Sequence, residues 1–281
     1  MKRFVTLLFL SFFVVSSSAF ASQFDDGMKL LKEKKLEESA KMLSQFAQEH
    51  PRESNAAQAL AVTARILDLL QDTFSERAEK KCYWGSKAPS TPACMRDEAK
   101  RLNEIYGKNA FDYIGGTSVA YIAYTGSHYK TVLKRHSKST FVDEAEFYQL
   151  LLKLEGHPDK VLPRIEKFQK QHPSGEWNRK ARLLWARVNE DVSFIWRKWT
   201  WVLFNGKITE DELIVRSAPY QRAAIAAYTE LAKQHAATVE GRMAAEELKQ
   251  LQATGDNGNV ISITNDASAT PWSKWGVTLS Q

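Results

Sequence analysis

Cysteine, proline and glycine are all scarce in this chain of 281 residues, which holds 2 Cys, 8 Pro and 13 Gly. Two cysteines are too few for a small disulfide-rich domain, and so little proline and glycine excludes a collagen-like or low-complexity chain. Because 43% of the residues are hydrophobic and 26% are charged, the chain has the composition of a globular protein that can bury its own core. The sequence therefore predicts a protein that folds without a metal or dense cross-links.

The motifs of common catalytic sites are also missing. The chain has no His-Glu-x-x-His, no Gly-x-Ser-x-Gly, no phosphate-binding glycine loop and no calcium loop. One match, Ser127-His-Tyr-Lys130, has the Ser-x-x-Lys spacing of penicillin-recognising enzymes, but no Lys-Thr-Gly follows it. Chance gives about two such matches in a chain this rich in Ser and Lys. We therefore expect no enzyme activity, no cofactor and no metal site.

The longest apolar run lies at the N-terminus. Two basic residues, Lys2 and Arg3, precede the apolar run 4–15, and small residues end at Ala21. This is the layout of a signal peptide, so we expect residues 1–21 to be cleaved off and the protein to reach the periplasm. The run is shorter than the roughly 20 residues that span a bilayer, although an uncut anchor is the alternative. The sequence does not distinguish the periplasm from full secretion.

Charge of one sign is in weak excess. The chain has 39 Lys and Arg against 33 Asp and Glu, a net charge of +6; removing Lys2 and Arg3 leaves 37 against 33, a net charge of +4. The positive residues are scattered and form no long basic run of the kind that binds nucleic acid. We therefore expect no nucleic-acid partner. We also expect no transmembrane segment in the mature chain.

The two cysteines, Cys82 and Cys94, are expected to form a disulfide, because an exported protein meets an oxidising environment. Gly85, Pro89 and Pro92 lie between them and predict a loop rather than a helix. In the chain-entropy model, closing a ring of this size contributes about 3 kcal/mol. A redox or metal pair is the weaker alternative, because the spacing is not Cys-x-x-Cys.

Apolar residues at helical spacing dominate the rest of the chain and predict an all-α fold. In the first segment, one stripe of a single helix contains Met28, Leu31, Leu36, Ala40, Leu43 and Phe46. After a break at His50-Pro51, a second stripe contains Ala56, Leu60, Ala64, Leu67 and Leu70. The pattern predicts two antiparallel helices.

The break at His50 recurs at His136, His172 and His235. Each histidine follows an apolar residue by four positions, and an Ala-bearing helical segment comes after each turn. The two central histidines are 36 residues apart, close to the helix–turn–helix repeat length of about 34. We expect each imidazole to replace a packed aromatic ring and to hydrogen-bond a helix end, rather than to bind a metal.

The stretch from Tyr129 to Phe147, with its turn His136-Ser-Lys-Ser139, is the best copy. It resembles the tetratricopeptide repeat, in the variant of bacterial envelope proteins such as outer-membrane assembly lipoproteins and cell-division coordinators. The resemblance covers about half of the mature chain and departs from the family where His replaces the usual aromatic and where Pro is missing at Ser137 and Ala236. It implies a helical solenoid whose concave face binds an extended peptide or a helix.

The predicted organisation has three parts. The signal peptide is followed by a helical repeat domain over 22–253 and a flexible tail over 254–281, in which 260–264 is a candidate strand. Two insertions interrupt the repeats. The disulfide-loop insertion at about 81–126 is rich in aromatic residues and Gly and is expected to form a bent helix pair, and the Trp-rich insertion lies at about 194–204. The repeats form either one superhelix or two halves divided near 205–220.

Tryptophans are the candidate partner-binding residues, because Trp is enriched at interface hot spots. They are Trp196, Trp199 and Trp201 in the second insertion and Trp272 and Trp275 in the polar tail. Core packing is the competing interpretation for the first group, and contact with a membrane surface is another.

The sequence thus favours a non-catalytic periplasmic scaffold that binds an envelope protein or peptide through a helical-repeat surface. Two alternatives stay open. One is a peptidoglycan-binding or cell-wall-processing protein that uses the aromatic insertions as a glycan platform, and the other is a structural envelope protein that self-associates through the Trp segment.

Overall fold

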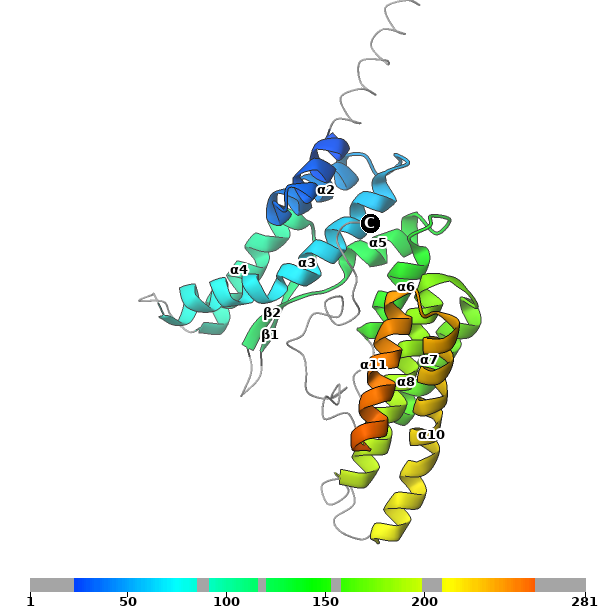
Figure 1. Cartoon of the computed structure of the whole chain (residues 1–281). Coiled ribbons are helices and arrows are strands. Elements are labelled where there is room, and N and C mark those ends of the chain that lie inside the picture. Colours follow the sequence, from blue (N-terminus) through cyan, green and yellow to red (C-terminus); the bar gives the residue numbers. More distant parts are fainter. Residues whose placement is uncertain (1–22, 85–90, 116–119, 153–157, 199–208, 256–281) are drawn as a thin grey trace, which may run out of the picture. The chain divides into compact units, whose positions relative to one another are not determined.

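The structure, a computed structural model, describes residues 23–84, 91–115, 120–152, 158–198 and 209–255 (Figure 1). The predicted signal peptide 1–21 and the candidate strand 260–264 lie outside these residues. Within the described ranges, no helix is both long enough and apolar enough to cross a membrane.

The fold is mostly helical, as predicted, and it divides into two compact units between Glu146 and Phe147, not near 205–220. The first unit holds a helix over residues 23–32, then α2 (Leu36–Glu49), α3 (Ala56–Glu79), the π-helical turn η1 (Lys80–Trp84), α4 (Thr91–Tyr106), β1 (Phe111–Gly115), β2 (Ala120–Tyr124) and α5 (Ser127–Arg135). The division falls within α6 (Val142–Leu151). The second unit continues with α7 (Pro158–Gln171), α8 (Gly175–Lys198), α10 (Glu210–Gln234) and α11 (Val239–Thr254).

The first apolar stripe belongs to two helices, so the prediction of one helix was wrong. Lys34 has a left-handed backbone with φ of 61°, and its N–H donates to Leu31 O at 3.0 Å. The Lys35 N–H donates to Leu30 O at 2.9 Å. These two bonds form a Schellman motif, which ends a helix and reverses the chain. The apolar spacing hides the break because both helices bury the same stripe.

The two short helices pack closely because Gly27 lies against Leu43. A Cβ at Gly27 would come within 2.7 Å of Leu43 Cδ2, and Ser39 Oγ donates to Gly27 O at 2.8 Å. On the other side, α2 packs against α3, whose first half buries Ala56, Ala57, Ala59, Ala61 and Ala64. Small side chains allow this close approach of helices.

The four histidine turns share one backbone hydrogen bond. The N–H of each histidine donates to the carbonyl four residues earlier, at 2.8 to 2.9 Å, in the pairs His50–Phe46, His136–Val132, His172–Phe168 and His235–Leu231. At His50, His136 and His235, φ lies between −128° and −124°. In those three turns, the histidine carbonyl accepts a hydrogen bond from the N–H of the residue three positions later. At His172, the side-chain amide of Asn178 donates to this carbonyl instead, at 2.5 Å.

The bond that recurs at these helix ends is therefore made by the histidine backbone, and the ring has a packing role where an aromatic residue precedes it. The rings of His50 and Phe46 have centroids 5.4 Å apart, and those of His172 and Phe168 are 4.4 Å apart. Burial and the neighbouring Arg135 lower the pKa of His136, which favours its neutral form.

Two predictions for the disulfide-loop insertion were wrong. Pro92 and Cys94 lie in the first turns of α4 rather than in a loop. Proline is tolerated there because the N–H groups of the first turn have no acceptor within the helix, so the N–H that proline lacks costs no hydrogen bond. The aromatic and Gly-rich segment after α4 forms an antiparallel hairpin of β1 and β2, not a bent helix pair. Phe111 pairs with Tyr124 at its base.

Side chains cover both outer edges of this hairpin near its base. The Asn103 side chain makes the two hydrogen bonds that a neighbouring strand would make. Its amide donates to Phe111 O at 3.0 Å, and its oxygen accepts the Phe111 N–H at 2.7 Å. On β2, the N–H of Tyr124 donates to Gln71 Oε1 at 3.0 Å. Because these edge groups are satisfied, the hairpin needs no further strand.

A buried ion pair joins α3 to α6 in the first unit. Arg65 donates from Nε and Nη2 to the two oxygens of Glu144, both at 2.5 Å, and Tyr129 OH donates to Glu144 Oε1 at 2.6 Å. All three side chains are buried. Burial opposes the charge of Arg65, but its hydrogen bonds and attraction to Glu144 outweigh burial and raise the pKa of Arg65.

In the second unit, α8 contacts α7, α10 and α11, and the last two lie beside it (Figure 1). Polar pairs connect α8 to α11 in order along both helices: Lys180 with Glu240 at 2.7 Å, Arg187 with Glu247 at 2.5 Å, and Arg197 with Gly255 O at 2.8 Å. Because both numbers rise together, α8 and α11 are parallel. The intervening α10 runs the opposite way, which is the arrangement of consecutive helical hairpins.

The turn between α10 and α11 packs closely against Gly241. A Cβ at this position would lie 1.9 Å from His235 O. Helix propensity alone favours alanine over glycine by about 1 kcal/mol, but the overlap with a backbone atom predicts that Gly241→Ala costs about 1 to 3 kcal/mol of unfolding free energy. Urea titration followed by circular dichroism measures the change.

The control is Ala245→Gly, at an exposed site on the same helix, which should lose about 1 kcal/mol from propensity alone. A Gly241→Ala protein that is more stable than the parent would contradict the tight turn.

Candidate functional site

Two helical faces meet where α3 and α4 run antiparallel. Phe74, Arg77, Ala78 and Lys81 line one side, and Glu98, Arg101, Leu102, Ile105 and Tyr106 line the other. Residues at these spacings of three and four share one face of a helix. The apolar members lie toward one end, where the rings of Phe74 and Tyr106 have centroids 5.6 Å apart.

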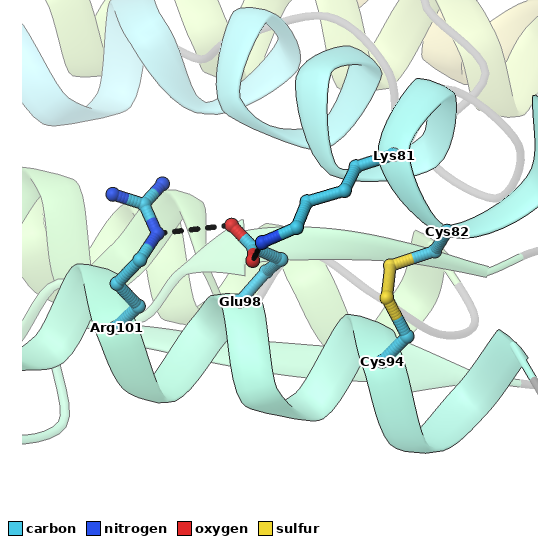
Figure 2. The surroundings of a disulfide bond; sticks show 5 residues. All are labelled: Lys81, Cys82, Cys94, Glu98 and Arg101. Atoms are coloured by element: carbon cyan, nitrogen blue, oxygen red, sulfur yellow. Dashed lines mark hydrogen bonds and ion pairs between the residues drawn. A yellow bond between two sulfur atoms is a disulfide. The ribbon is translucent and has the colours of Figure 1, made fainter. Parts of the chain in front are cut away.

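The disulfide closes the other end of this helix pair. Cys82 lies in the π-helical turn η1 and Cys94 in α4, with Cα atoms 5.7 Å apart, so the expected pairing is present (Figure 2). The bond and the aromatic contact hold the helices at opposite ends, and the charged residues lie between them. Single π-helical turns within helices are frequent at functional sites.

A pocket of about 290 Å³ lies between the two faces and is bordered by Glu37 of α2. Its floor is apolar, because Phe74, Ala78, Leu102 and Tyr106 are all buried. Its rim is charged and contains three cationic side chains, Arg77, Lys81 and Arg101, with two carboxylates, Glu37 and Glu98. The lining therefore has a formal charge of +1 over an apolar floor.

The two rim carboxylates pair with the three rim cations. Glu98 accepts from Lys81 Nζ and from Arg101 Nε, the latter at 3.0 Å, and Figure 2 shows the two cations approaching it from different sides. Glu37 lies 2.6 Å from Arg77 Nη1. The side chains of Arg77, Lys81 and Arg101 stay 55 to 62% exposed, so they can also meet a molecule from solvent.

The site shifts two pKa values. Burial alone would raise the pKa of Glu98, but hydrogen bonds from Lys81 and Arg101 outweigh it and hold that pKa below the ordinary value. Burial, with a smaller contribution from Glu37, raises the pKa of Tyr106 to about 12. At neutral pH, Glu98 is therefore ionised and the Tyr106 hydroxyl is neutral.

The end of α4 is fixed by two side chains from other elements. The Tyr106 carbonyl accepts from Ser44 Oγ at 2.6 Å and from His128 Nε2 at 2.9 Å. Because the carbonyl can only accept, Nε2 of the neutral imidazole carries the proton, and His128 Nδ1 accepts from Tyr124 OH at 3.0 Å. Burial lowers the pKa of His128 to about 4. The neutral imidazole thus positions one wall of the pocket.

The Ser-x-x-Lys match surrounds this buried histidine. Ser127 begins α5, and the Lys130 side chain is exposed to solvent, whereas His128 between them is buried. The match therefore presents its lysine to solvent rather than to a cleft.

The predicted partner-binding residues are described only in part. Trp196 lies near the end of α8, because residues 194–198 continue that helix, and Arg216 Cζ lies 5.2 Å from its ring centroid. The other four, Trp199, Trp201, Trp272 and Trp275, lie outside the described residues. Among the residues that the structure describes, the lining of the α3–α4 pocket includes no predicted tryptophan.

Sequence analysis did not identify the pocket residues. The signal was present as two charged and apolar stripes of matching spacing, 74–81 and 98–106, that flank the cysteines. Each stripe by itself is typical of a solvated helix face. Only the antiparallel pairing next to the disulfide brings them together.

Comparisons with known proteins add no relative: no family model matches the chain, and no match was found among curated proteins or solved structures.

Removing the disulfide should destabilise the protein. The variant Cys82→Ser/Cys94→Ser is expected to lose about 3 kcal/mol of unfolding free energy, because its unfolded chain regains the entropy of an open loop. Denaturant titration with and without dithiothreitol measures this. The reductant should lower the stability of the parent and leave the variant unchanged. Equal stability of the oxidised parent and the variant would contradict the expectation.

Glu98 should make stability sensitive to acid. Its pKa is lower in the folded protein than the ordinary value of about 4.3, so its contribution is present above that pH and is lost as the pH falls through the folded pKa. Between about pH 5 and pH 2.5, Glu98→Gln should lose less stability than the parent. The control Glu104→Gln, at an exposed site on α4, should follow the parent. Parallel curves for parent and Glu98→Gln would refute the ion-pair assignment.

Proposed function

We propose that this protein is an exported, non-catalytic adaptor of the cell envelope that binds a partner protein through its helical surface. The observation that carries the proposal is the recurring turn between two helices: a histidine ends one helix at four places, and at His50, His136 and His235 its carbonyl accepts the N–H three residues later. Recurrence of one turn in one chain is typical of stacked helical hairpins, whose continuous surfaces bind proteins.

The second unit supports this interpretation most directly. Its helices α8, α10 and α11 alternate in direction, and the polar pairs between α8 and α11 keep the two parallel helices in register over 18 residues of α8, from Lys180 to Arg197. The same arrangement, repeated, gives the tetratricopeptide-like solenoid that the sequence resembles.

Export is the second element of the proposal. The leader-like residues 1–21 and the disulfide between Cys82 and Cys94 agree, because disulfides persist mainly outside the reducing cytoplasm. We place the protein in the periplasm on these grounds.

We place the partner-binding surface around Trp196 and the first turns of α10. Ile214 and Val215 are 55% and 70% exposed, and the next residue, Arg216, contacts Trp196. The two exposed apolar side chains are therefore close in sequence to an arginine that contacts a tryptophan, and these two residue types are enriched at interface hot spots.

Site-specific photo-cross-linking tests the proposal. A photoreactive phenylalanine derivative at Val215 should, after irradiation of living cells, join the protein to one dominant envelope protein. The derivative at Lys41, an exposed position on α2, serves as the matched control and should give no such product. Trp196→Ala should reduce the yield from Val215 by about tenfold, since a hot-spot truncation costs at least 1 to 2 kcal/mol.

Three results would overturn the adaptor proposal. Cross-links only between copies of the chain would favour self-association, and recovery of glycan fragments would favour wall binding. Retention of the protein in the cytoplasm would contradict export.

A further inference from the structure

We propose that the α3–α4 pocket is a binding site for a small carboxylate with an apolar body about the size of one aromatic ring. This inference goes beyond the adaptor function, because the pocket lies within the first unit and requires neither the repeats nor a protein partner.

The size and the floor of the pocket define the apolar part of the ligand. A volume of about 290 Å³ is near the lower end for ligand pockets, which start at about 300 Å³. A cavity of about 150 Å³ holds benzene, so this pocket has room for one aromatic ring with a short polar chain. Phe74 and Tyr106 form the aromatic part of the floor, with Leu102 and Ala78 beside them. A ring placed here displaces water from apolar side chains that form few hydrogen bonds with that water, and the hydrophobic effect favours this displacement.

The rim defines the charged part. Arg101 uses only Nε for Glu98, and its two terminal nitrogens point away from that carboxylate (Figure 2). Arg77 uses Nη1 for Glu37. Among the described residues, neither guanidinium has a further hydrogen-bond acceptor. Two arginines with unused donors at the rim of one pocket favour an anion.

The charge balance favours a carboxylate over other anions. The lining has a formal charge of +1, so one negative charge neutralises it, whereas a phosphate dianion would leave an excess beside Glu37 and Glu98. The planar guanidinium also matches a carboxylate through two parallel N–H bonds.

The disulfide gives the site a fixed width. Cys82 is adjacent to Lys81, and Cys94 precedes Glu98 by one helical turn, so the bond holds the two charged faces together from one end (Figure 2). A site that is formed before binding loses less entropy when the ligand arrives.

The test uses the oxidised full-length mature chain and two probes of nearly equal shape, 3-phenylpropanoate and the neutral 3-phenylpropanamide. Binding is followed by two-dimensional ¹H–¹⁵N NMR, which also shows which residues respond. The carboxylate should shift signals of residues 74–81 and 98–106 in a saturable way. The amide should bind about tenfold more weakly or worse, because it loses the charge-assisted bonds.

Matched variants locate the anion. Arg101→Gln should weaken binding of 3-phenylpropanoate by about tenfold or more, and the control Lys100→Gln, which removes the same charge from the neighbouring exposed residue, should change it less than about twofold. Reduction of the disulfide should weaken binding as well.

Several outcomes would overturn the proposal. Equal binding of acid and amide, an unchanged affinity in Arg101→Gln, or shifts confined to other residues would each exclude a carboxylate site here. Tighter binding of phenyl phosphate than of the carboxylate would assign the pocket to a different anion. The comparison of acid and amide uses the unaltered protein, so it decides the matter even if a variant does not fold. None of these results depends on a partner protein, so the adaptor proposal stands or falls separately.

Discussion

The end of each helix is the constraint on which this fold depends most. The last four carbonyls of a helix have no partner within it, and a short turn must satisfy some of them while reversing the chain. Here the backbone N–H of His50, His136, His172 and His235 does so in the same way. The cost of a wrong side chain is highest where the turn is tightest, at Gly241. The same bond also ends α4, α6 and α11, at Gly107, Leu152 and Gly255, so the histidine turns use a solution that recurs throughout the described helices.

Buried charges then determine which helices become neighbours. Lys180 and Glu240 pair α8 with α11, and Arg65 with Glu144 pairs α3 with α6. Removing water from such groups costs about as much free energy as their attraction returns, so they add little net stability. An unpaired buried charge is far more costly, however, and a shifted helix would create one. These pairs therefore select one register among several that apolar surfaces alone would allow.

The α3–α4 pair differs from the other described helix pairs because a covalent bond joins its two elements. Cys82 and Cys94 hold the helices at one end, and the contact between the rings of Phe74 and Tyr106 holds them at the other. The cations Arg77, Lys81 and Arg101 then line the space between and stay exposed, whereas Glu98 is buried. The same unit also contains the β-hairpin, whose edge groups are satisfied by Asn103 and Gln71. The first unit thus combines helical packing with a small cross-linked pocket.

The sequence by itself determined the helical class, the positions of the histidine turns and the pairing of the two cysteines, because periodicity, helix ends and cysteine number are local or countable properties. It did not reveal the helix break at Lys34, since a left-handed lysine has no distinctive spacing. The β-hairpin, the parallel order of α8 and α11 and the pocket were decided only by tertiary structure. Each depends on residues that are not neighbours in the chain, such as Gln71 with Tyr124 or Lys81 with Glu98, whose meeting is set by packing and by the disulfide rather than by any local pattern.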